Sequence, residues 1–201
     1  MKRLAILFIL LGVCLTTIGG YQWYQTNAAQ NKSLQEAKQL VEKNQLPSSN
    51  GHTDTISFPD QFNPSVGETV GLLHIPKLSA QLPIVEGTDE DELEKGVGHY
   101  RGTAYPTQQD QIVLSGHRDT VFRRMGELEI GDILTIQLPP YGSFSYEISN
   151  TKVVPANDRS IIVPTAPNEV LTVTTCYPFT YIGNAPDRYI ITALPIESKK
   201  K

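Results

Sequence analysis

The sequence is poor in the residues that cross-link small secreted domains and in those that bind nucleic acid. It holds two cysteines in 201 residues, too few for a disulfide framework or a thiolate zinc site. Its formal net charge is −4, and residues 60–195 hold nine basic against seventeen acidic side chains. This balance argues against a nucleic-acid partner, because such proteins gather basic residues on one face. The chain also lacks a zinc motif and a dinucleotide-binding motif.

Long apolar stretches are scarce too, and the one present lies at the N-terminus. Residues 4–20 carry no charge, follow Lys2 and Arg3, and precede Tyr21, Trp23 and Tyr24. At 1.5 Å per residue this stretch spans about 25 Å, close to the minimum for crossing a hydrocarbon core. A cleaved signal peptide is the alternative, but the bulky aromatic residues favour an uncleaved, single-pass anchor over residues 1–24. The two basic residues predict a cytoplasmic N-terminus and an extracytoplasmic domain.

The anchor is followed by a polar segment and then by a single domain. Residues 25–65 are rich in Gln, Asn and Ser, and Leu34, Ala37 and Val41 form one apolar patch at helical spacing. We expect a spacer here. Proline and glycine at residues 47–51 should end any helix that forms in it. The working domain is expected over residues 66–195, with a basic tail at residues 196–201.

The sequence of the domain predicts mostly β-structure. Phe144, Tyr146 and Ile148 alternate with polar residues, which is typical of half-buried antiparallel strands. Helical material is expected only at residues 89–95 and 121–128. Eight short apolar runs bounded by Gly and Pro predict a barrel or sandwich, and they cover residues 70–75, 82–85, 112–114, 133–138, 144–148, 161–163, 170–174 and 189–194.

No residue pattern requires a metal or another cofactor. The acidic run at residues 88–95 is conceivable as a calcium site, but it lacks the alternating Asp, Asn and Gly of a calcium loop. Acidic residues in a first helical turn are favoured by the helix dipole, which explains the run without a ligand.

Three reactive side chains fall at predicted strand ends. Cys176 closes the run 170–175 before Pro178, His117 follows the run that ends in Gly116, and Arg188 opens the last run. Thiol catalysis needs a nucleophile, a group that titrates near neutrality and a group that stabilises an oxyanion. Each residue alone has a structural explanation, such as a buried thiol or a surface ion pair. Together they predict a catalytic site.

The segments around these residues resemble the signature segments of sortases, the cysteine transpeptidases of Gram-positive cell surfaces. They are Leu171-Thr-Val-Thr-Thr-Cys176-Tyr-Pro-Phe179, Leu114-Ser-Gly-His117-Arg-Asp-Thr-Val-Phe-Arg123 and Ala185-Pro-Asp-Arg188-Tyr-Ile. Weaker similarity extends the resemblance to residues 66–195, and the Cys-Tyr-Pro-Phe segment is most similar to class D.

The resemblance implies an eight-stranded barrel with short helices and assigns roles to individual residues. Cys176 would attack the carbonyl after Thr in a Leu-Pro-x-Thr sorting signal, His117 would act as acid and then base, and Arg188 would bind the oxyanion. Thr175 and Tyr177 would contact the substrate. The implied partners are surface proteins with this signal, a lipid-linked peptidoglycan precursor as amine acceptor, and the membrane.

Some alternatives stay open at this point. Asp119 either orients His117 or caps the local backbone. The chain could instead be a Cys-dependent peptidase or an enzyme like the L,D-transpeptidases, although the His-Gly-Cys cluster usual in the latter is absent around Cys176. A non-catalytic β-domain with a buried Cys176 is the third possibility.

Overall fold

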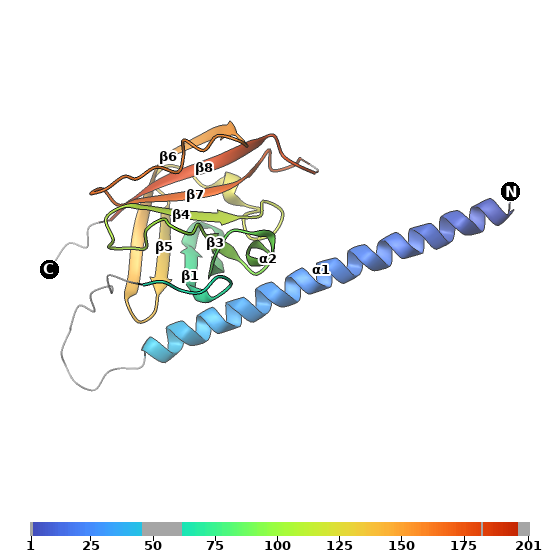
Figure 1. Cartoon of the computed structure of the whole chain (residues 1–201), viewed down its shortest axis with the longest axis horizontal. Helices are drawn as coiled ribbons and strands as arrows, with labels where there is room; N and C mark the ends of the chain where they lie inside the picture. The colour runs from blue at the N-terminus through green and yellow to red at the C-terminus, as the bar shows by residue number, and fades with distance from the viewer. Residues whose placement is uncertain (1, 46–61, 182, 197–201) are drawn as a thin grey trace.

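Eight β-strands close into a barrel in the computed structural model, which describes residues 2–45, 62–181 and 183–196 (Figure 1). Their order around the barrel is β1-β2-β3-β4-β7-β8-β6-β5, and the pairs β2–β3 and β4–β7 are parallel. The predicted mostly-β barrel is confirmed. The strands are β1 (Thr69–Ile75), β2 (Ala80–Glu86), β3 (Val97–His99), β4 (Gln111–Gly116), β5 (Ile133–Leu138), β6 (Gly142–Pro155), β7 (Val170–Tyr177) and β8 (Asp187–Pro195).

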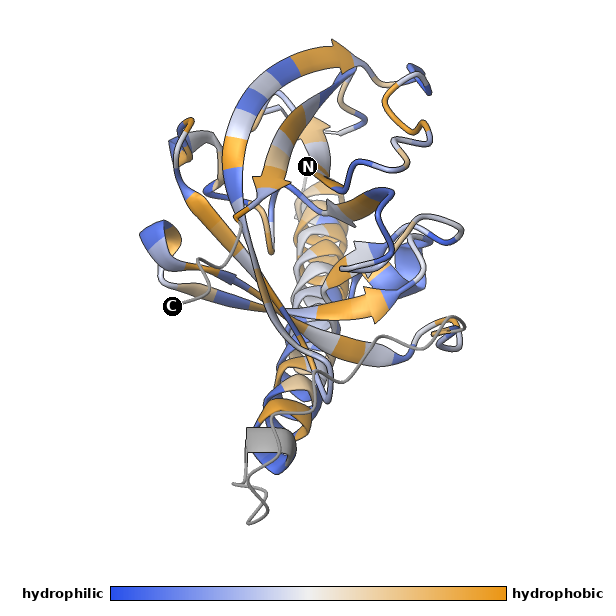
Figure 2. Cartoon of the chain, turned by 90° about the vertical axis from the view of Figure 1, so that its left-hand side faces the viewer, coloured by the Kyte–Doolittle hydropathy of each residue, from blue (hydrophilic) through white to orange (hydrophobic). Residues whose placement is uncertain are grey.

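The barrel interior is filled by the apolar half of each alternating strand. In β5, Leu134, Ile136 and Leu138 are buried, while the residues between them are half-exposed. Hydrophobic and hydrophilic residues alternate along the curved strands in the same way (Figure 2). Because successive side chains of a strand point to opposite faces, this period of two places one set in the core. Phe122 and Met125, from the segment between β4 and β5, complete the core.

The set of eight strands differs from the predicted set at two places. The predicted strand 161–163 is wrong, because its backbone groups bond to a side chain instead of to a strand. The side-chain amide of Gln111 donates to the Ile161 carbonyl at 2.7 Å and accepts from the Val163 amide at 2.9 Å. The short strand β3 was not predicted, since it has only three residues and Gly at its centre.

The helices inside the domain are short. A helix was expected at residues 89–95, and α2 spans Glu90–Leu93. The helix expected over residues 121–128 is wrong except for one 3-10 turn, η2 (Met125–Glu127), because the chain before it forms turns in which Phe122 N donates to the His117 carbonyl. A second 3-10 turn, η1 (Pro76–Leu78), joins β1 to β2.

The N-terminal segment is one continuous helix, α1 (Lys2–Gln45). Its first half projects away from the barrel (Figure 1) and is, among the described residues, the helix that is long and apolar enough to cross a membrane. The second half makes residues 25–45 of the expected spacer helical. It packs on β1 and β2, with Ser33 and Ala37 buried and the Thr69 hydroxyl donating to Glu36 at 3.2 Å. The rest of the expected spacer, residues 46–61, and residues 197–201 of the basic tail lie outside the described residues.

A buried polar cluster joins β2, β3 and the segment that follows β3. Glu86 is 5% exposed, and its Oε2 lies 2.7 Å from His99 Nδ1 and accepts from the Tyr105 hydroxyl at 2.6 Å. His99 Nε2 lies 3.0 Å from the Ala104 carbonyl, and the His99 and Tyr105 rings stack. Burial alone raises the pKa of Glu86, but the hydrogen bonds of His99 and Tyr105 outweigh it and hold the pKa below its ordinary value.

We predict that Glu86→Gln lowers the free energy of unfolding by about 2 kcal/mol at neutral pH, because a neutral amide accepts the hydrogen bonds of His99 and Tyr105 less strongly than a carboxylate and adds a buried NH2 donor. A carboxyl with a lowered folded-state pKa stabilises the fold above its unfolded pKa of about 4.3. That contribution is lost as the pH falls through the folded-state pKa, so the difference between the two proteins should shrink below about pH 4. Urea unfolding at several pH values measures this.

The exposed Glu94→Gln is the control for this prediction, and its effect should stay within about 0.5 kcal/mol. An equal loss of stability in both variants would contradict the role given to the buried cluster.

Candidate active site

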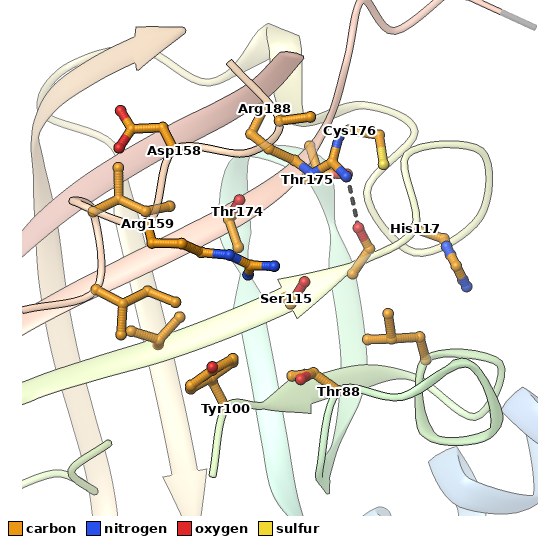
Figure 3. A pocket seen from close by; sticks show the side chains of 16 residues that line it. Thr88, Tyr100, Ser115, His117, Asp158, Arg159, Thr174, Thr175, Cys176 and Arg188 are labelled. Atoms are coloured by element: carbon orange, nitrogen blue, oxygen red, sulfur yellow. Dashed lines mark hydrogen bonds between the residues drawn. The ribbon is translucent and has the colours of Figure 1, made fainter. Parts of the chain in front are cut away.

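The parallel pairing of β4 and β7 brings the two predicted catalytic segments together. Gly116 is the register partner of Thr175, so His117 and Cys176, the next residues on each chain, emerge at the same end of the barrel. Thr175 is only 2% exposed, and its hydroxyl donates to the Gly116 carbonyl at 2.7 Å (Figure 3). The predicted strand-end position of these residues is confirmed.

Arg188 reaches the same place from the next strand. It is the register partner of Cys176 in the antiparallel pair β7–β8. Its Nη1 donates to the backbone carbonyls of Asp187 at 2.9 Å and Ala185 at 3.3 Å. These bonds orient the guanidinium, and its Nε and Nη2 groups make no hydrogen bond within the described residues.

Cys176, His117 and Arg188 line one pocket of about 340 Å³. The thiol is free and half-buried. In Figure 3 its sulfur lies between the other two side chains, while the imidazole of His117 points away from it. No hydrogen bond joins the three side chains in the described parts of the chain. Such bonds are often long or absent without substrate, so the arrangement is a nucleophile, an acid–base group and a cation around one space.

Of the other predicted site residues, Thr175 lines the pocket, whereas Tyr177 and Asp119 do not. The Thr175 hydroxyl is used internally, as described above. Tyr177 packs its ring against Phe179 and Tyr189, on the opposite face of β7 from Cys176. Asp119 is exposed, and its backbone carbonyl accepts from Arg123 Nε at 3.1 Å. No contact between the Asp119 carboxylate and His117 is present among the described residues, so the structure offers no support for an orienting role.

The pocket also has lining residues that the sequence did not indicate. Arg159, from the segment between β6 and β7, extends toward Thr174 and Ser115 (Figure 3). The Thr174 hydroxyl is buried without a partner among the described residues. Hydrogen bonds from Ser160 hold the pKa of neighbouring Asp158 below its ordinary value. None of these residues belongs to a recognisable motif, and their position follows from a loop that only the fold reveals. Apolar contacts come from Leu93, Val113, Ile161 and Ile162.

The segments beside the pocket are tied together by Arg118. Its Nη2 donates to the Gly183 carbonyl at 2.8 Å, and its guanidinium lies 5.9 Å from the centre of the Tyr181 ring. The turn after His117 is thus connected to the segment between β7 and β8. Within the described residues, no three His, Cys, Asp or Glu side chains gather as a metal site.

Comparisons with known proteins agree with this geometry. The Sortase domain family matches residues 73–196. The chain is 51% identical over 193 residues to Sortase D of Bacillus subtilis, which covers 95% of this chain and 97% of that protein. The structure is similar to a Sortase D5 transpeptidase of Clostridium perfringens, with a TM-score of 0.66, 26% identity, and coverage of 84% of this chain and 99% of that one. Sortase C1 of Streptococcus suis gives a TM-score of 0.60 with 28% identity, over 66% of this chain and 75% of that one.

A closed β-barrel with a cysteine, a histidine and an arginine at one end is the arrangement of a cysteine transpeptidase. The chain belongs to the sortase family. The resemblance seen in its three sequence segments, including the similarity to class D, is confirmed. The chain is therefore an enzyme, and the non-catalytic alternative is set aside.

We predict that Thr175→Val lowers the free energy of unfolding by about 1–2 kcal/mol and reduces catalysis, because it removes the buried donor to the Gly116 carbonyl beside His117. Thr175→Ser keeps the hydroxyl and should retain most of the activity. Urea unfolding together with peptide turnover tests this pair. A larger loss in Thr175→Ser than in Thr175→Val would contradict this, because it would show that the methyl group, and not the hydrogen bond, holds the two strands.

Proposed function

We propose that this chain is a membrane-anchored transpeptidase that cleaves Leu-Pro-x-Thr sorting signals after Thr and transfers the acyl group to an amine of a cell-wall precursor. The observation that carries the proposal is the single pocket at which the Cys176 thiol, the His117 imidazole and the Arg188 guanidinium meet. Membership of the sortase family supports the same reaction class.

The proposed first step forms a thioester. The Cys176 thiolate attacks the carbonyl carbon of Thr in the signal, and the peptide bond to the next residue breaks. His117 gives a proton to the departing amine. For this step the imidazole, which faces away from the sulfur in Figure 3, has to turn toward the pocket. The free donors of Arg188, already oriented by two backbone carbonyls, stabilise the oxyanion.

The second step reverses these roles. An incoming amine attacks the thioester carbonyl, His117 takes its proton, and Cys176 leaves as the thiolate. The product is a new amide bond between the surface protein and the precursor. The reaction needs no redox change and balances without a cofactor.

The lining of the pocket supports an apolar signal. Leu93, Ile161 and Ile162 offer apolar surface for Leu and Pro side chains, while Arg159 and Thr174 offer polar groups in the same pocket. Such a mixture of apolar walls and a few polar groups suits a short extended peptide.

The proposed location follows from α1. Its apolar first half has the length of a membrane span, and Tyr21, Trp23 and Tyr24 lie where interfacial aromatic residues are enriched. With Lys2 and Arg3 on the cytoplasmic side, the barrel lies outside the cell. Membrane-held precursors and secreted proteins are then both within reach.

We predict that the full chain in detergent, mixed with a Leu-Pro-x-Thr peptide and diaminopimelate, yields the amide transfer product. Cys176→Ala should give none. His117→Ala and Arg188→Ala should lower kcat/KM by about 10²-fold or more, the usual loss for an acid–base group or an oxyanion donor. Chromatography with mass detection separates transfer from hydrolysis.

Hydrolysis without transfer to any amine would favour the peptidase alternative. Undiminished product from Cys176→Ala would overturn the proposed nucleophile. Tyr141→Phe, a change on the distant β5–β6 turn, is the control and should keep wild-type turnover.

A further inference from the structure

A second hollow, a groove of about 510 Å³, lies between α1 and the loop that follows His117. One wall is the α1 face that contains Trp23, Asn27 and Gln30, and the other contains Asp119 and Arg123. The catalytic pocket and this groove therefore share one loop, which presents His117 to the pocket and residues 119–121 and 123 to the groove.

The groove contains donors that the protein itself does not use. The Nε2 atom of Gln30 is buried and has no hydrogen-bond partner among the described residues. Arg123 is exposed and uses only its Nε, which donates to the Asp119 carbonyl. Its two terminal nitrogens remain for a ligand. Guanidinium donors suit a phosphate, which accepts several hydrogen bonds at once.

The groove also has one carboxylate, that of Asp119. A purely anionic ligand would be repelled by it, whereas a ligand with both a phosphate and an amine satisfies the two charges. Asp119 lies nearer than Arg123 to His117 along the loop. This order places the amine end of such a ligand toward the catalytic histidine.

The position of the groove along α1 matches the depth of lipid phosphates. The apolar stretch ends at Gly20, and the groove begins at Trp23 and ends at Gln30. At 1.5 Å per residue, the groove lies about 5–15 Å beyond the end of the span. The headgroup layer occupies roughly the first 5–7 Å beyond the hydrocarbon core. A phosphate that is attached to a membrane lipid therefore lies beside the Trp23 end of this groove, and the groups that extend outward from the phosphate lie beside the Gln30 end.

We propose that the groove binds the phosphate-bearing headgroup of the lipid-linked amine acceptor, with Arg123 on the phosphate and Gln30 on the polar groups that extend outward from it. This proposal rests on the transpeptidase function proposed above. The α1 helix is then part of the acceptor site as well as an anchor, and the acceptor amine arrives at the thioester from the His117 side of the pocket.

The test compares a lipid-linked peptidoglycan precursor with soluble diaminopimelate as acceptors for the full chain in lipid nanodiscs. In Arg123→Gln the KM for the lipid-linked acceptor, divided by the KM for soluble diaminopimelate, should rise roughly tenfold. This rise corresponds to the loss of one hydrogen bond to a charged group. The matched control is Arg124→Gln, because Arg124 is also exposed on this loop but pairs with Glu127 and the Leu78 carbonyl. Its ratio should stay within about twofold. An unchanged ratio in Arg123→Gln, or the same rise in both variants, would overturn the proposal.

Direct binding gives a readout that does not depend on turnover. Trp23 is the only tryptophan in the chain and lines the groove, so its fluorescence reports occupancy. Titration with the lipid-linked peptidoglycan precursor, which carries both phosphate and amine groups, should change the emission, with an affinity about tenfold weaker in Arg123→Gln. Equal affinity for phosphatidylethanolamine would overturn the assignment to the acceptor.

The two readouts also separate this proposal from the proposed function. If the wild-type protein transferred the peptide to neither acceptor, the transpeptidase function would fail, and the titration would still decide whether the groove binds the lipid-linked precursor. Transfer to both acceptors without any Trp23 response would overturn only the groove.

Discussion

The parallel pairing of β4 with β7 is the constraint on which the site depends. These strands lie far apart in the sequence, and their register sets Gly116 against Thr175 so that His117 and Cys176 emerge side by side. The buried hydrogen bond from Thr175 to the Gly116 carbonyl fixes this register at the last position before the reactive residues. Closing the barrel through β8 then adds Arg188 opposite Cys176. A slip of one residue would turn each side chain to the other face of the sheet.

The α1 helix links the catalytic barrel to the apolar N-terminal stretch. Its second half is packed on β1 and β2, so the catalytic end of the barrel has a defined position relative to the apolar first half. Residues Trp23–Gln30 of α1 lie beside the loop that follows His117. Residues Glu36–Lys43 of α1 lie beside the start of β1. The catalytic end is therefore the end nearer the apolar stretch. Under the proposed function, with that stretch in a membrane, the peptide, the acceptor and the catalytic end of the barrel meet at one depth.

The sequence predicted the parts of the fold that local pattern determines. Seven of the strands have apolar runs with Gly or Pro at their ends. The same Gly and Pro positions predicted that Cys176, His117 and Arg188 lie at strand ends. The strand β3 was missed and 161–163 was misassigned, because pairing partners and the side chain of Gln111 decide those segments. Arg159 in the pocket and the groove beside Trp23 depend on contacts between distant segments. Tyr177 was predicted to contact substrate, but strand alternation turns it to the opposite face from Cys176.

The central claim is that Cys176 carries the acyl group during the reaction, and intact-mass spectrometry of the acid-quenched enzyme tests it most directly. After brief mixing with a Leu-Pro-x-Thr peptide and no acceptor, the protein should gain the mass of the peptide fragment ending in Thr. Peptide mapping should place that mass on Cys176, the one cysteine outside α1. Addition of an amine should remove it. Peptide cleavage without a covalent adduct, or an adduct on another residue, would contradict the account.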